Sequence, residues 1–165
     1  MTLKRLVPGF VLGFALLGML MLPSFSKAGD TGVQKAVYHV DFGNAKRMNA
    51  TLHNIYNLVN YYTVKNIDYD VRLVSNSAGV QFMIKNVKGT KFAGNKIPPK
   101  IAKSIAEMMQ SLADAYDVKF EQCNITLQRT HIDKSRLKSF VNVVPSAQVR
   151  LVELEGRGFA YIKVQ

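Results

Sequence analysis

The sequence has no tryptophan and a single cysteine, Cys123, among its 165 residues. Exported proteins normally pair their cysteines, but one cysteine cannot form an intramolecular disulfide. The thiol must therefore be buried, bonded to another molecule or left reactive. The domain must also be stable without disulfides, which a chain of this length can achieve by burying an apolar core.

Acidic residues are also scarce, because 11 Asp and Glu face 22 Lys and Arg and give a formal net charge of +11 at pH 7. The densest basic stretches, residues 85–103 and 129–138, lack a run of interleaved aromatic side chains. Such charge can attract anions or anionic lipid, or it can simply be a solvated face. Since no recognised nucleic-acid-binding module accompanies it, we do not expect nucleic acid as a partner.

The usual catalytic and metal-binding motifs are missing as well. The chain contains no GxSxG, no Walker loop and no GxGxxG, which excludes the commonest hydrolases, nucleotidases and dinucleotide-binding proteins. His39, His53 and His131 have no second ligand-type residue at metal-ligand spacing, so no zinc site is expected. His131 could act as a base for Cys123, although eight residues separate the two.

One long apolar run is present near the start, Leu6–Leu22, and it is 17 residues long. Its flanks have the features of a secretory signal: a basic start, a helix break and small residues where signal peptidase cuts (Lys4 and Arg5, Pro23, and Ser26 with Ala28). We therefore expect residues 1–28 to be removed and residues 29–165 to form one periplasmic or secreted domain. Its net charge would be 11 − 3 = +8, since three Lys and Arg lie in the signal. The alternative is an uncleaved anchor, with membrane contact through this segment alone.

The remaining sequence alternates strand-like with helix-like segments. We expect strands at residues 35–42, 68–75, 118–122, 140–144 and 159–164, and helices at 44–63, 80–87, 98–115, 124–130, 133–138 and 147–155. Asn44 can cap the first helix, and Pro98 and Pro99 suit the first turn of another. The expected buried stripes of the two long helices are Met48, Leu52, Ile55, Val59 and Tyr62, and Ile101, Ile105, Met108, Leu112 and Ala115.

This alternation predicts a largely parallel sheet with helices on both faces. Ligands of such sheets bind beyond the carboxyl ends of the strands. Three turns should therefore converge on a shared pocket: Asp41–Asn44, Ser75–Gly79 and Cys123–Thr126.

Cys123 lies where a strand turns into a helix, with Lys119 and Arg129 close by in sequence. Backbone N–H groups at that turn would favour the thiolate over the thiol, and a thiolate could hold a persulfide. The alternative is an inert buried cysteine, because free cysteine is among the most buried residue types. The sequence leaves both open.

Other polar residues near the expected site have simpler explanations. Asp41, which closes the first strand, is expected to cap a turn rather than bind a ligand. Asn54 and Asn57 flank the buried stripe of the first helix, although Asn is a poor residue inside a helix. Their side chains either bond to neighbouring loops or a second subunit, or are simply exposed to solvent.

Several segments, in this order, resemble the DsrE/DsrF-like family, and within it the exported branch described as intracellular sulfur oxidation-like. They are VYHVDF, LHNIYNLVN, LVSNSAGV, CNITL and VVPSAQVRLVELEGRGFAYIKV. The resemblance extends from about Lys35 to Val164. It implies a three-layer α/β/α fold with a small, mostly parallel five-stranded sheet, assembled as trimers or hexamers.

The resemblance also implies a function and a site. Relatives carry sulfur as a persulfide on a cysteine that matches Cys123, and relay it between donor and acceptor proteins without a metal or organic cofactor. The residues expected to bind the ligand are Asn124, Thr126, Asn44, Asn76 and Gly79, and Asn54 and Asn57 match the helix motif at an interface. The chain departs from the family in having Asn76-Ser77 where relatives often have His-Gly. The alternative is a non-catalytic ligand-binding or assembly module of the same fold with a structural cysteine.

Overall fold

The computed structural model describes residues 32–164, so the expected signal peptide lies outside the described residues. The elements, in chain order, are β1 (Gln34–Val40), α1 (Ala45–Val64), β2 (Tyr69–Ser75), the 3-10 turn η1 (Ser77–Gly79), α2 (Val80–Met83), α3 (Pro99–Tyr116), β3 (Lys119–Cys123), α4 (Asn124–Thr130), the 3-10 turn η2 (Lys134–Arg136), β4 (Val141–Val144), α5 (Ala147–Gly156) and β5 (Ala160–Lys163).

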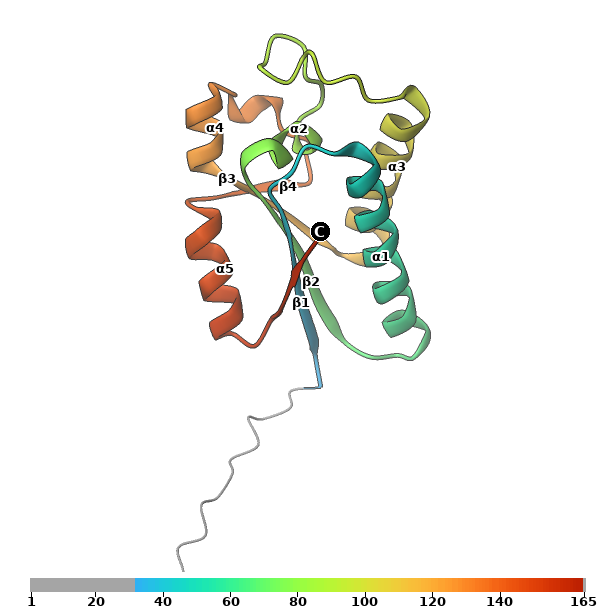
Figure 1. Cartoon of the computed structure of the whole chain (residues 1–165). Coiled ribbons are helices and arrows are strands. Elements are labelled where there is room, and N and C mark those ends of the chain that lie inside the picture. The colour runs from blue at the N-terminus through green and yellow to red at the C-terminus, as the bar shows by residue number, and fades with distance from the viewer. Residues whose placement is uncertain (1–31, 165) are drawn as a thin grey trace, which may run out of the picture. The chain divides into compact units, whose positions relative to one another are not determined.

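The five strands form one parallel sheet with the order β4-β3-β2-β1-β5. The chain steps from β1 to β4 in one direction, and α5 then returns it to β5 beside β1. Because crossovers between parallel strands are right-handed, this reversal places α5 on the face opposite α1 and α3 (Figure 1). The expected three-layer α/β/α fold is confirmed.

Each face of the sheet buries its own apolar cluster. The larger cluster lies under α1 and α3, and the α1 residues Met48, Leu52, Ile55 and Val59 within it are fully buried. The smaller cluster lies under α5 and consists of Val37, Val74, Cys123, Ala147, Leu151, Leu154 and Phe159. Cys123 therefore lies at the border between a helix-covered core and the carboxyl edge of the sheet.

Local signals set the starts of the long helices as expected. The side-chain oxygen of Asn44 accepts a hydrogen bond from the Arg47 N–H at 2.9 Å and caps α1. Pro99 is the first residue of α3, where its missing N–H costs no helical hydrogen bond. The α3 helix is followed by Asp117, whose backbone adopts the left-handed conformation at φ 53° and ends the helix.

The helix expected over residues 80–87 is wrong in length. The α2 helix stops at Met83 because Ile84 is extended and forms an antiparallel bridge with Leu137. The Lys138 N–H also donates to the Met83 carbonyl at 3.0 Å. This tertiary pairing replaces the helical bonds that α2 would need in order to continue. The helix expected over residues 133–138 is likewise only the short turn η2.

The stripes of the two long helices also need correction near their ends. In α3, Met109 is fully buried, whereas Met108 is half-buried and Ala115 is exposed. The buried positions Ile105, Met109 and Leu112 follow an i, i+4, i+7 pattern, so the true stripe is shifted by one residue at Met109. In α1, Tyr62 is half-buried and lies against Tyr69 at the start of β2.

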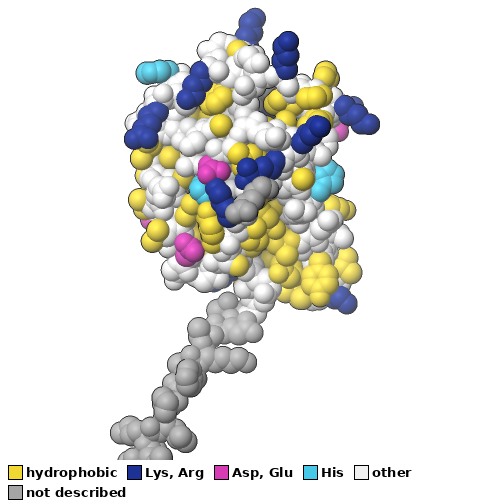
Figure 2. All heavy atoms as spheres, viewed as in Figure 1, with side chains coloured by type: hydrophobic (Ala, Val, Ile, Leu, Met, Phe, Trp, Pro, Cys, Tyr) yellow, Lys and Arg dark blue, Asp and Glu magenta, His cyan; other side chains and the backbone are white. Residues whose placement is uncertain are grey.

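The carboxyl ends of the strands meet at the basic end of the domain. Lys and Arg side chains gather there in the space-filling view (Figure 2). The segment from Lys85 to Lys103 belongs to this end and contains six Lys and no Asp or Glu. Within residues 32–164, no helix is both long and apolar enough to cross a bilayer.

Candidate functional site

Cys123 is the last residue of β3 and is 5% exposed. It lies against a pocket of about 350 Å³ at the carboxyl edge of the sheet. The residues lining this pocket are Asn76, Ser77, Cys123, Ile125, Thr126, Arg129, Ser146, Ala147 and Gln148. They come from the segments that follow β2, β3 and β4. The pocket therefore gives a nearly buried thiol access to solvent.

The sulfur atom of Cys123 is surrounded by hydrogen-bond donors. Burial would by itself raise the pKa of the thiol, but hydrogen bonds from the Ala147 N–H, the Thr126 N–H and hydroxyl, and the Ile125 N–H outweigh it, so the pKa lies below its ordinary value. These donors stabilise a negative charge on sulfur. Two helices supply them, since Ala147 begins α5 whereas Ile125 and Thr126 lie in α4.

A hydrogen bond from η1, the turn after β2, reaches the Thr126 hydroxyl. The backbone N–H of Ser77 donates to Thr126 Oγ1 at 3.1 Å. With a lone pair of its oxygen occupied, the hydroxyl can point its proton at the Cys123 sulfur. Ser77 makes this contact in the left-handed region, at φ 47°, which is uncommon for a residue other than glycine.

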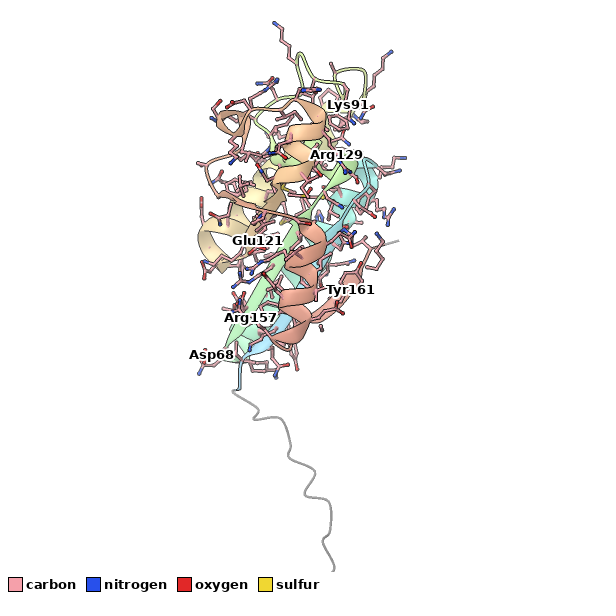
Figure 3. The ribbon with its side chains drawn as sticks, turned by 90° about the vertical axis from the view of Figure 1, so that its left-hand side faces the viewer. Asp68, Lys91, Glu121, Arg129, Arg157 and Tyr161 are labelled. Carbon is pink, nitrogen blue, oxygen red and sulfur yellow. The ribbon has the colours of Figure 1, made fainter. Side chains whose placement is uncertain are left out.

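Of the two cations near Cys123 in sequence, only Arg129 lines the pocket. It lies in the last turn of α4, toward the carboxyl end of the sheet (Figure 3). Lys119 begins β3 at the opposite end of the strand and forms an ion pair with Asp117. Arg129 is the one charged residue lining the pocket in the described part of the chain, so the pocket favours an anion.

The expected convergence of three turns needs a partial correction. The turns after β2 and β3 meet at the pocket, but residues 41–44 after β1 are not among its lining residues. The segment Ser146–Gln148 after β4 takes their place. The sequence reasoning missed this segment, although Pro145-Ser146 also follows the carboxyl end of a parallel strand and the same topological rule applies to it.

The structure brings only two of the predicted ligand-binding residues to the Cys123 pocket. Asn76 and Thr126 line the Cys123 pocket. Asn124 and His131 line a separate pocket of about 450 Å³, and neither residue lines the Cys123 pocket. Asn44 serves as the cap of α1.

Gly79 is required by close packing. A Cβ atom at this position would lie 2.3 Å from the Val40 carbonyl oxygen and 2.6 Å from Ser75 Oγ. No side chain fits there without displacing backbone. The absence of a side chain at Gly79 therefore allows η1 to pack against the end of β1. This packing also positions Ser77 and Asn76 at the start of the same turn.

The remaining candidates lie away from the pocket. Asn54 and Asn57 are exposed, and within residues 32–164 their carboxamides make no hydrogen bond. Asp41 forms an ion pair with Lys163 at 2.6 Å rather than capping a turn. The His53 ring bonds to the Asn49 carbonyl in its own helix. Among the described residues, no group of three or more His, Cys, Asp or Glu could hold a metal.

A buried ion cluster fastens the Cys123 strand to α5. Glu121, in the middle of β3, accepts hydrogen bonds from Arg150 Nε at 2.6 Å and from Arg72 Nη1 at 2.9 Å. Figure 3 shows Glu121 beside α5, well below Arg129. The Arg72 guanidinium is also paired with Asp70. Because Arg150 belongs to α5, this cluster helps to set where the Ala147 N–H points.

Comparisons with solved structures and with protein families show which known proteins this chain is similar to. The structure is similar to that of a protein of unknown function from Methanobacterium thermoautotrophicum, with a TM-score of 0.59, 21% sequence identity, and coverage of 79% of this chain and 98% of that chain. The comparison with curated proteins gave no match. The model of the DsrE/DsrF-like family matches residues 35–164, which is most of the chain. The chain therefore belongs to the DsrE/DsrF-like family.

Proposed function

We propose that this protein is a sulfur carrier that accepts sulfane sulfur as a persulfide on Cys123 and relays it to a partner protein. The observation that supports this most is the set of donors around the Cys123 sulfur, which lowers the pKa of a thiol that burial alone would raise. An inert structural cysteine needs no such donors and no pocket beside it. Membership of the DsrE/DsrF-like family favours the same function.

The proposed chemistry consists of two nucleophilic displacements at sulfur. The Cys123 thiolate attacks the sulfane sulfur of the donor, a new S–S bond forms, and the donor thiolate leaves with the electrons of the broken S–S bond. An acceptor thiolate then attacks the outer sulfur, and Cys123 leaves as a thiolate. The electrons balance in each step without an external oxidant, and the proposed carrier requires no metal or organic cofactor.

The surrounding residues have distinct roles in this proposal. The Ala147 N–H and the Thr126 hydroxyl stabilise the thiolate both as nucleophile and as leaving group. Arg129 attracts anionic sulfur compounds into the pocket. None of these roles requires the sulfur of Cys123 to be widely exposed, because the pocket leads to it.

Intact-protein mass spectrometry after exposure to inorganic tetrasulfide tests the proposal. We expect the folded wild type to gain one sulfur atom that a reductant removes, and Cys123→Ala to gain none. Arg157→Ala, at the far end of the domain, is the control and should gain sulfur like the wild type. If the folded chain gains nothing but its thiol reacts after denaturation, the cysteine is structural and the chain is a ligand-binding or assembly module.

We further propose that the carrier works in the periplasm, in keeping with the exported branch that the sequence resembles, and that residues 1–28 are a cleaved signal peptide. The mass of the protein recovered from the periplasm of an expressing bacterium tests this. A chain that begins at Gly29 is expected. A periplasmic or membrane-bound chain that keeps Met1–Leu22 would contradict cleavage and indicate an anchor.

A further inference from the structure

A hydrogen-bonded chain of side chains reaches the Cys123 pocket from β5. The Tyr161 hydroxyl lies 2.8 Å from His39 Nδ1, and His39 Nε2 lies 3.1 Å from the side-chain oxygen of Asn76. Tyr161 is partly exposed, His39 is buried in β1, and Asn76 lines the pocket (Figure 3 labels Tyr161). The three residues therefore come from β5, from β1 and from the turn directly after β2.

The hydrogen bond to His39 orients the Asn76 carboxamide. A carboxamide oxygen only accepts hydrogen bonds, so His39 Nε2 carries the proton and donates. The Asn76 NH2 group is then the free end, and within residues 32–164 it has no hydrogen-bond acceptor. With the proton on Nε2, His39 Nδ1 accepts from the Tyr161 hydroxyl, so both ring nitrogens of His39 have a partner in this orientation.

The Asn76 amide is near the thiol but does not act on it. The hydrogen bonds to the Cys123 sulfur come from Ala147, Thr126 and Ile125, and Asn76 is not among the donors. Asn76 nevertheless lines the same pocket. Its NH2 group therefore borders the space in front of the sulfur, where a second sulfur atom bonded to Cys123 would be.

We propose that Asn76 donates a hydrogen bond to the outer sulfur of the Cys123 persulfide, and that His39 and Tyr161 are positioning residues that hold Asn76 in place. This inference rests on the proposed function. A persulfide anion carries its charge on the outer sulfur, and a hydrogen bond to a charged atom is stronger than one to a neutral atom. The site thus has separate donors for the inner and the outer sulfur.

The test begins by loading the full mature chain with inorganic tetrasulfide. The Cys123 thiolate attacks a terminal sulfur, one S–S bond forms, one S–S bond of tetrasulfide breaks, and trisulfide leaves with the bonding electrons. After removal of excess donor, the chain is equilibrated with glutathione, whose thiolate takes the outer sulfur and returns Cys123 to a thiolate. Intact mass gives the fraction of chain that keeps sulfur.

For Asn76→Ala, we expect this equilibrium to shift toward glutathione by about tenfold, the effect of losing one hydrogen bond to a charged group. Asn76→Asp should shift it further, because a carboxylate repels the persulfide anion. The pH midpoint for alkylation of the unloaded thiol should not change in Asn76→Ala, since Asn76 makes no bond to that sulfur. Asn142→Ala, which removes an exposed amide on β4, is the matched control.

The His39 variants separate positioning from general support of the fold. His39→Leu should lose sulfur to glutathione as Asn76→Ala does, and His39→Gln, whose amide can still donate to Asn76, should recover most of that loss. The proposal is overturned if Asn76→Ala keeps sulfur as well as the wild type does, or if its thiol midpoint shifts along with the loss. A wild type that takes up no sulfur overturns the proposed function instead.

Discussion

Thr126 links two elements of the site through one hydroxyl group. Its oxygen accepts from the Ser77 N–H, and the hydroxyl helps to lower the pKa of the Cys123 thiol. The side chain is nearly buried, so its shape matters as well as its hydrogen bonds. A substitution that keeps the shape and removes the hydroxyl isolates the electrostatic contribution.

Thr126→Val should therefore raise the pKa of the Cys123 thiol and slow its alkylation at neutral pH by roughly threefold to tenfold, as expected for one hydrogen bond to a charged sulfur. The rate of alkylation as a function of pH measures this. Thr130→Val is the control, because the Thr130 hydroxyl bonds to the Thr126 carbonyl and not to sulfur. An unchanged midpoint in Thr126→Val would mean that the backbone N–H groups alone set the pKa.

The buried amine of Lys138 makes the free energy of unfolding depend on pH. Burial lowers its pKa to about 8, and its ammonium group donates to the carbonyls of Phe82 at 3.0 Å and Ile84 at 2.7 Å. Between about pH 8 and the ordinary value of 10.5, the unfolded chain holds this proton more tightly than the folded chain does. The contribution of Lys138 to stability therefore rises with pH in that range.

Chemical denaturation of the wild type and Lys138→Met at several pH values measures this contribution. We expect the wild type to gain unfolding free energy relative to the variant as the pH rises from about 8 to about 10. Lys65→Met, which changes an exposed lysine, should show no such trend. A difference between wild type and Lys138→Met that stays flat or falls would contradict the lowered pKa.

The Glu121 cluster joins three elements, β3, β2 and α5. The Glu121 side chain is 5% exposed and is paired with two guanidinium groups. Removing the charge of this buried carboxylate leaves Arg72 paired only with Asp70, and Arg150 only with the mostly exposed Glu153. Breaking a buried ion pair in this way typically costs several kcal/mol. The cluster therefore contributes to the alignment of Cys123 with the start of α5.

Glu121→Gln should lower the unfolding free energy by about 3 kcal/mol. Glu153→Gln is the matched control, because it removes a mostly exposed partner of Arg150 and should cost less than about 1 kcal/mol. Urea denaturation of both variants gives the comparison. Equal losses of unfolding free energy in the two variants would show that the buried cluster stabilises the fold no more than the exposed ion pair does.

Particular elements show why the sequence predicted the fold better than the site. The stripe of α1 and the Asn44 cap are local signals that tertiary contacts do not override. The end of α2 at Met83 depends on Leu137, more than fifty residues away, and no local pattern contains that contact. The donors to the Cys123 sulfur are mostly backbone N–H groups, whose direction is set by packing and not by residue type.

Two exposed faces of the domain are candidates for self-assembly. One is the outer side of α1 with Asn54 and Asn57, and the C-terminal end of the same helix exposes apolar side chains (Figure 2). The other is the outer side of α5, where Val149 is 55% and Val152 is 70% exposed. Because Gln148 of α5 lines the Cys123 pocket, assembly through α5 would place a second chain beside the site.

We expect light scattering to give a trimer or a hexamer at tens of micromolar protein. Burying apolar side chains is favourable, so a charge placed on the face in use should dissociate the assembly. Val152→Glu and Asn57→Glu test the two faces in turn. A wild type with the mass of one mature chain would contradict the proposed oligomer.

In the function that we propose, Cys123 passes sulfur on as well as accepting it. The most direct measurement loads the chain with tetrasulfide labelled with a heavy sulfur isotope, removes the donor and adds an acceptor thiol. We predict that the label appears on the acceptor as a persulfide while Cys123 returns to a free thiol, and that Cys123→Ala transfers nothing. Label that stays on the folded wild type, or never attaches to it, would contradict the proposed sulfur transfer.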